Sequence, residues 1–159
     1  MDVQTLDSYE AQAGALALAI AGLTNSDLNT LPSGAPGQWT IQQNIFHLLD
    51  SDLVASDRMK RMIAEDNPTL IAYDENRFVK ILNYDKLDVR AAAELFRLNR
   101  KLTASLLRQQ PNSAFARSGT HNQRGNLTVE QLVTDYIHHV NHHMEFVRKK
   151  RALLGKPMA

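Results

Sequence analysis

The chain of 159 residues contains no cysteine. Disulfide bonds, thiolate-ligated metal sites and cysteine nucleophiles are therefore excluded. Any metal ion that the protein holds must be bound through nitrogen and oxygen atoms. Any thiol that takes part in its chemistry must be supplied by another molecule.

The chain also lacks an excess of either charge and a long apolar run. Its 18 Lys and Arg residues face 17 Asp and Glu residues, a formal net charge of +1. No broad basic field therefore indicates nucleic acid or an anionic membrane surface as a partner. No apolar run approaches the roughly 18–20 residues that span a bilayer, and residues 1–4 lack the basic start of a signal peptide. We expect a cytoplasmic protein that binds neither nucleic acid nor membrane.

Glycine and proline are scarce, with seven and five copies, and most of them cluster between residues 32 and 37 or between 111 and 125. Between these breaks, apolar residues recur at helical spacing. The pattern predicts helices over residues 3–23, 40–64, 88–108 and 128–154, a short irregular or helical crossover over 73–83, and long loops over 24–39 and 111–126. The residue pairs Thr40 with Gln43 and Thr128 with Gln131 fit capping boxes, and Asp88 fits an N-cap.

Four long helices predict an all-α fold, a four-helix bundle in one domain over residues 1–159. Strands are not expected, because alternating β-branched runs are nearly absent and neither Asn-Gly nor Asp-Gly occurs. The apolar stripes predicted to face the core are Leu6, Tyr9, Ala13, Leu16, Ile20 and Leu23; then Ile41, Ile45, Leu48, Leu49, Met59 and Ile63; and then Ala91, Leu95, Leu98, Leu102 and Leu106.

Four of the six histidines lie within residues 138–143. Each helical residue advances about 100° around the axis, so His139 and His143 flank the predicted core face of the last helix, whereas His138 and His142 point to solvent. Both pairs have the i, i+4 spacing that lets two imidazoles reach one metal ion. Only His139 and His143 are directed at a groove beside the core. The alternative is that all four are surface or half-buried residues without a metal-binding role.

Two imidazoles are too few for a tight zinc site, which needs at least three protein ligands. The third ligand is either His47 or His121. His47 lies on a mostly polar helix face, which is typical of solvent exposure, but Asp50 lies one turn away and can orient a ligand or a bound water. His121 lies in a loop where a mobile surface histidine is typical. The loops over 24–39 and 111–126 each lead into a candidate ligand helix, and loops of this length often form functional sites.

Three segments together resemble a known family. They are Gly37-Gln38-Trp39-Thr40 followed by His47-Leu48-Leu49-Asp50-Ser51, then Tyr73-Asp74-Glu75, and finally Gly125-Asn126-Leu127-Thr128 followed by His139-Val140-Asn141-His142-His143. In this order they are similar to motifs of the DinB/YfiT-like superfamily, whose YfiT-type branch includes bacillithiol-transferase-like proteins.

The resemblance implies a four-helix bundle with up-down-down-up topology, often as a homodimer. It also implies a divalent metal ion, zinc or nickel, held by three histidines. Transferred residue by residue, these ligands are His47, His139 and His143. The helical wheel selects the same two residues of the last helix by an independent route.

Three neutral imidazoles leave a coordination position open on the metal ion. An ion so held lowers the pKa of bound water to roughly 7, polarises a carbonyl or binds a thiolate. The sequence therefore predicts a metal-dependent hydrolase, or an S-transferase that uses a low-molecular-weight thiol and a second small molecule. Asp50 is a candidate catalytic residue, as an orienter or a base. The alternative is a non-catalytic, stress-associated helical binding module with a structural metal ion or none.

Overall fold

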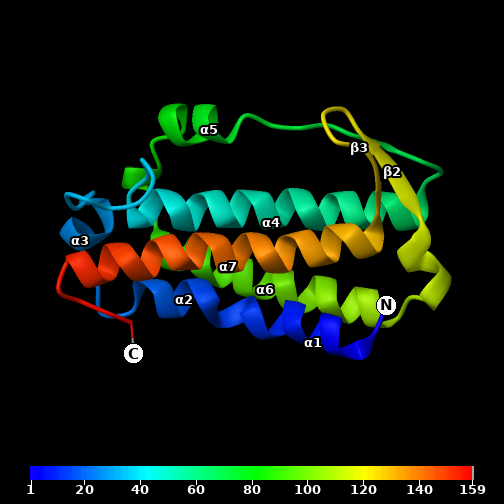
Figure 1. Ribbon diagram of the computed structural model, residues 1–159, viewed down its shortest axis with the longest axis horizontal. Coiled ribbons are helices and arrows are strands. Elements are labelled where there is room, and N and C mark those ends of the chain that lie inside the picture. The colour runs from blue at the N-terminus through cyan, green and yellow to red at the C-terminus, as the bar shows by residue number, and fades with distance from the viewer. Residues whose placement is uncertain (159) are drawn as a thin grey trace.

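The computed structural model describes residues 1–158, which fold into a bundle of four long helical segments (Figure 1). The first segment consists of α1 and α2, and the other three are α4, α6 and α7. Their bounds are Val3–Ala11, Ala15–Ile20, Ile41–Ala64, Val89–Arg108 and Val129–Leu153. The first and last segments run in one direction, and α4 and α6 run in the other (Figure 1). The predicted four-helix bundle with up-down-down-up order is confirmed.

The helix starts follow the predicted capping signals. Thr40 accepts the Gln43 amide N–H, and the Gln43 side chain accepts the Thr40 N–H, which forms a capping box at the start of α4. Thr128 and Gln131 form the same box at α7, and the Asp88 side chain caps α6. Local sequence therefore fixes where three of the long helices begin.

The first predicted helix is interrupted. A 3-10 turn at Gln12–Gly14 separates α1 from α2, although all six residues of the predicted stripe are buried. The Gln12 amide donates to the Ile137 carbonyl and to Asn141 of α7, so the turn directs a side chain across the bundle. The following segment, predicted as a loop, contains the short helix α3, Asn25–Asn29, which a capping box of Thr24 and Asp27 starts.

The crossovers contain a small sheet, and the expectation of no strands was wrong here. Strand β1 (Thr69–Leu70) precedes helix α5 (Glu75–Ile81), and β2 (Ser118–His121) and β3 (Gly125–Thr128) form a hairpin before α7. β1 pairs in parallel with β2, and β2 pairs antiparallel with β3. A Cβ atom at Gly119 would lie 3.0 Å from the Pro68 carbonyl oxygen, so β2 needs glycine to pack there. Strands this short, paired across distant segments, leave no periodic signal.

The predicted inward face of α6 was also wrong. Leu95, Leu98 and Leu102 are 46%, 50% and 67% exposed. The residues of α6 that face the core include Phe96, Arg100 and Leu107. The buried Arg100 explains the difference. Because a charged residue lies on the core face of α6, a prediction that assigns the core face from apolar residues alone selects the wrong side of the helix.

The core consists of two apolar clusters along the bundle. One includes Leu48, Phe96 and Val140, and the other includes Met59 and Val133.

Between the two clusters lies a polar layer around a buried ion pair. Arg100 Nε donates to Asp52 Oδ1 at 2.6 Å, with both side chains almost fully buried. The same guanidinium donates to Gln12 and to the Tyr136 carbonyl. The hydrogen bonds of this layer thus connect the first helical segment, α4, α6 and α7 at the middle of the bundle. Over residues 1–158, no helix is long and apolar enough to cross a membrane.

Candidate metal centre

Three histidines from two helices converge beside the polar layer. His47 lies on α4, and His139 and His143 lie on α7. Their candidate ligand atoms all lie within 4.8 Å of one another, and Nε2 of His47 lies 3.0 Å from Nε2 of His139. These are the three residues that the family resemblance implies.

The helical wheel separated the histidines of α7 correctly. His143 is buried and His139 is half-buried, whereas His138 and His142 are exposed. His47 is only 3% exposed, although its polar helix face is typical of solvent exposure. That face turns toward α7, so His47 is buried at the junction of the two helices.

Asn44 fixes the orientation of His143. The Asn44 amide nitrogen donates to the Thr40 carbonyl at 2.8 Å, which leaves its Oδ1 to accept. Oδ1 lies 3.1 Å from Nδ1 of His143, so that ring nitrogen must carry the proton. The lone pair of His143 is therefore on Nε2. A hydrogen bond to the far ring nitrogen is the usual support of a metal-binding histidine.

Burial keeps all three imidazoles neutral. It lowers the pKa of His47 to about 3, with a further contribution from His139. It likewise lowers the pKa of His143 to about 3 and that of His139 to about 4. Neutral imidazole is the form that binds a metal ion, so no proton must leave these side chains first at pH 7.

The donor set fits a divalent ion with a preference for imidazole. Zinc–nitrogen bonds of about 2.0–2.1 Å in tetrahedral geometry place ligand nitrogens about 3.3 Å apart, close to the 3.0 Å between the two Nε2 atoms. Nδ1 of His47 is buried without a hydrogen-bond partner among residues 1–158. Imidazole suits zinc and nickel alike. The centroid of the Trp39 indole lies 4.7 Å from that of the His47 ring and 6.0 Å from that of the His143 ring. The indole therefore covers one side of the group of three histidines.

Two cavities adjoin the three histidines. The first, about 380 Å³, reaches His139. Its other lining residues are Ser51, Arg58, Ala72, Tyr73, Glu75, His121, Gln123, Arg124, Asp135, Tyr136 and His138. The second, about 330 Å³, reaches His143 and is also lined by Trp39 and Lys150. Glu75 of α5 lines both. The two segments that the sequence indicated as long functional loops thus contribute Trp39 to one cavity and His121 to the other.

His121 is not the mobile surface residue that its loop position indicated. It is buried in β2 and lines the first cavity, but it does not belong to the group of three converging histidines.

Asp50, the candidate catalytic residue, is half-buried and accepts a hydrogen bond from the Tyr84 hydroxyl. Burial raises the pKa of its carboxyl, and the Tyr84 hydrogen bond partly offsets that rise. No hydrogen bond joins Asp50 to a histidine within residues 1–158, and its catalytic role stays a prediction.

Sequence reasoning did not identify Ser51, Tyr73 or Tyr136 as residues of the site. Ser51 lies one turn after His47, and Tyr136 lies one turn before His139, so helical spacing from the ligands contained a signal for both. The Ser51 and Tyr73 hydroxyl oxygens lie 3.0 Å apart. Burial is the main cause that raises the pKa of Tyr73 to about 12, so its hydroxyl stays protonated and able to donate.

Comparison with known proteins identifies the family of this chain. Residues 8–147 match the sequence profile of the DinB superfamily. The chain belongs to the DinB superfamily. It is 30% identical over 128 residues to a proposed metal-dependent hydrolase of Oceanobacillus iheyensis, covering 80% of this chain and 73% of that protein.

YfiT from Bacillus subtilis, also described as a proposed metal-dependent hydrolase, is 25% identical over 154 residues, or 96% of this chain and 84% of that protein. Its solved structure, described as a four-helix bundle of unusual topology, superposes with a TM-score of 0.88. The match has 25% identity and covers 96% of this chain and 86% of that chain. The predicted DinB/YfiT-like fold is therefore confirmed.

Proposed function

We propose that this DinB-superfamily chain is a metal-dependent hydrolase in which His47, His139 and His143 hold one divalent ion, zinc or nickel. The observation that carries the proposal is the convergence of three neutral imidazoles, one of which, His139, lines a cavity of about 380 Å³. The names of its relatives, proposed metal-dependent hydrolases, support the same reaction class.

The side chains around the site have distinct roles in such a reaction. When bound, a divalent ion with an open position lowers the pKa of a water ligand to about 7 and polarises a carbonyl. The protonated Tyr73 hydroxyl, held by Ser51, donates to an oxygen of a small-molecule substrate in the cavity. Asn44 holds the His143 ring in place. Asp50 is proposed as an orienter or base, and Asp50→Asn tests it by the loss of turnover with unchanged metal content.

The second cavity favours a second candidate, transfer of a low-molecular-weight thiol. One cavity is lined by His139 and the other by His143. Two cavities that each reach one histidine of the same cluster can hold two substrates, whereas hydrolysis needs one substrate and water. Because the chain has no cysteine, the thiol must be a cosubstrate. Turnover of an electrophile only when a thiol is added distinguishes this candidate from hydrolysis of an ester or amide panel without thiol.

Metal content tests the site directly. Protein purified without a histidine tag is expected to hold about one zinc or nickel ion per chain, by elemental analysis. His47→Ala, His139→Ala and His143→Ala each reduce this content toward zero, because two imidazoles hold zinc weakly. His138→Ala and His142→Ala are matched controls and keep the ion. Full occupancy in the first three variants would refute the assignment. Metal retention with melting on chelation and no turnover would indicate a structural ion.

A homodimer is proposed for the same protein. Leu95, Leu98 and Leu102 lie at i, i+3 and i+7 on α6, a spacing typical of a helix–helix seam, and all three are exposed. Glu94 and Lys101 flank the stripe with opposite charges, so an antiparallel second copy brings each near the other.

Light scattering tests the dimer. Leu98→Glu is expected to shift the protein to a monomer. Leu18→Glu, an exposed position on α2, serves as the control. A wild-type monomer, or an unchanged mass in Leu98→Glu, contradicts the proposal.

A further inference from the structure

Arg58 on α4 is a buried cation without an acidic partner. Its residue is 8% exposed. Its Nη2 donates to the Ile71 carbonyl at 2.6 Å, and its Nη1 lies 3.4 Å from the Tyr136 hydroxyl. None of the ion pairs within residues 1–158 includes Arg58, whereas the fully buried Arg100 pairs with Asp52.

The positive charge of Arg58 is therefore not compensated by an ion pair, and some of its N–H groups donate no hydrogen bond to residues 1–158. A guanidinium has five N–H donors, and the acceptors that Arg58 meets are neutral. A buried charge is costly unless an opposite charge compensates it. Arg58 also forms part of the wall of the first cavity, so an anion that enters the cavity can supply the missing partner.

Two further donors surround the same space. Arg124, at the turn between β2 and β3, and His121 line the cavity together with Arg58. After burial, the charges of Arg58 and then Arg124 lower the pKa of His121, which is consistent with three groups around one space. Nδ1 of His121 accepts the Gln123 backbone N–H at 3.2 Å. The neutral ring therefore carries its proton on Nε2, which is a donor.

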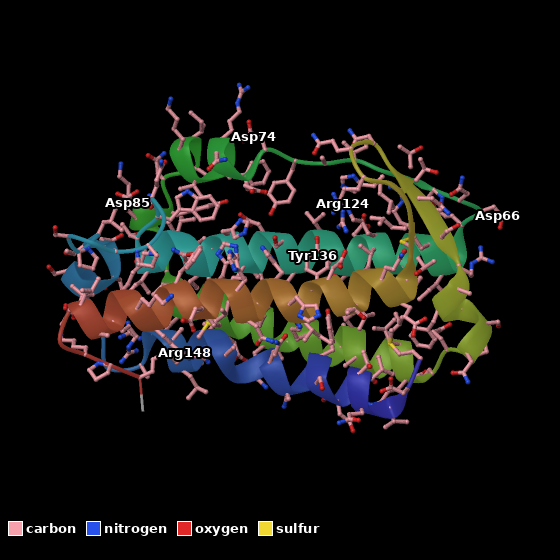
Figure 2. All side chains as sticks on the ribbon, viewed as in Figure 1. Asp66, Asp74, Asp85, Arg124, Tyr136 and Arg148 are labelled. Atoms are coloured by element: carbon pink, nitrogen blue, oxygen red, sulfur yellow. The ribbon has the colours of Figure 1, made fainter. Side chains whose placement is uncertain are left out.

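The acidic residues of the cavity do not neutralise Arg58. Asp135 pairs with Arg124 at 2.6 Å. Glu75 is the first residue of α5 and forms no ion pair with Arg58 among residues 1–158. Figure 2 shows Arg124 near the hairpin and Asp74, the N-cap of α5, farther along the bundle. The cavity thus has a cationic end at the hairpin and an acidic residue near α5.

Tyr136 links the cationic end to the three histidines. Its hydroxyl lies beside Arg58, and its ring centroid lies 5.8 Å from that of His139. Figure 2 shows Tyr136 on α7, between the hairpin side and the middle of the bundle. One tyrosine side chain therefore separates the cationic end from a candidate metal ligand.

We infer that Arg58, assisted by Arg124 and His121, binds the carboxylate of a small-molecule substrate whose reacting group lies at His47, His139 and His143. A carboxylate fits because its two coplanar oxygens match two parallel N–H groups of one guanidinium. That the bound molecule is a substrate rests on the proposed metal-dependent function, but carboxylate binding does not.

Three probes with the same ring test the inference on metal-free protein, where no probe can bind through a metal ion. They are benzoate, its neutral counterpart benzamide, and phenylphosphonate. Titration by NMR is expected to give a Kd for benzoate at least tenfold below that for benzamide. Arg58→Gln raises the benzoate Kd at least tenfold and leaves that of benzamide unchanged. Arg97→Gln, an arginine on α6 outside the cavity, is the control and changes neither.

Arg124→Gln keeps the test decisive if Arg58→Gln does not fold, because the Arg124 side chain is half exposed. It is expected to raise the benzoate Kd about threefold. Equal Kd values for benzoate and benzamide would overturn the inference, as would a benzoate Kd that neither arginine variant changes. Tighter binding of phenylphosphonate would overturn the choice of a carboxylate. Metal content is measured separately, so failure here and failure of the metal site are distinguishable.

Discussion

The buried pair of Arg100 and Asp52 offers the sharpest test of how this bundle is held together. Arg100→Met removes a guanidinium that donates to the Asp52 carboxylate at 2.6 Å, to Gln12 at 2.9 Å and to the Tyr136 carbonyl at 3.0 Å. Asp52, 1% exposed, then remains as an uncompensated charge in the core.

Breaking a buried pair in this way destabilises a protein by about 3–5 kcal/mol. Urea unfolding of the metal-free protein, followed by circular dichroism, measures the free energy of unfolding. Arg97→Met is the matched control, one turn earlier on the same helix. Its ion pair with Glu94 is largely exposed, so its loss should cost less than about 1 kcal/mol.

The double variant Arg100→Met with Asp52→Leu separates the ion pair from simple loss of packing. Replacing both charges by apolar groups of similar size is often neutral or stabilising, whereas removing one partner is not. The double variant should therefore recover at least half of the stability that Arg100→Met loses. If Arg100→Met costs no more than Arg97→Met, or if Asp52→Leu adds a second loss of equal size, the reasoning is refuted.

Two further predictions concern the histidines. Asn44→Ala removes the acceptor that holds Nδ1–H of His143 and should weaken zinc affinity about 10–100-fold, measured by competition with a chromophoric chelator; an unchanged affinity contradicts that role. The metal-free protein should lose stability as pH falls below about 6.5. In the unfolded chain the three histidines take up protons at their ordinary pKa. In the folded chain burial lowers the pKa of His47 and His143 to about 3 and that of His139 to about 4. That stability is fully present above pH 6.5, and each histidine contributes a slope of up to about 1.4 kcal/mol per pH unit between 6.5 and its folded pKa. Urea midpoints across this range measure the slope, which should become clearly shallower in the triple alanine variant and stay unchanged in His142→Ala.

Helix ends and one half of the candidate metal centre could be predicted from local sequence. The boxes at Thr40 and Thr128 form between residues three apart, so their geometry depends on little else. The spacing of His139 and His143 on a single helix likewise fixes their common side. The same reasoning placed His138 and His142 in solvent, where they lie.

The position of α6 shows where local pattern was insufficient. Apolar periodicity selected Leu95, Leu98 and Leu102 for the core, but the helix faces inward with Arg100. The pairing of Arg100 with Asp52, a residue 48 positions earlier, decides that orientation, and no window along α6 contains the partner. Strand β1 escaped prediction for the same reason, because it pairs with β2 across some 50 residues. The hairpin of β2 and β3 is local, but strands of four residues are too short for a period-2 signal.

The sequence alone determined that this protein is a helical bundle without a cysteine thiolate of its own, with a histidine pair aimed at a groove. Backbone periodicity, capping and composition are local properties, and each can be read without knowing what packs against a helix. The local sequence around His47 and His121 did not decide which of them joins His139 and His143, and only the family resemblance selected His47. The tertiary structure shows that His47 is the one that converges with the pair. The packing of α4 against α7 buries His47 beside the pair, and the small sheet holds His121 at the cavity wall instead. The sequence also contained no sign that Arg58 lacks an acidic partner among residues 1–158. Whether a cation has such a partner depends on segments that meet only in the folded chain.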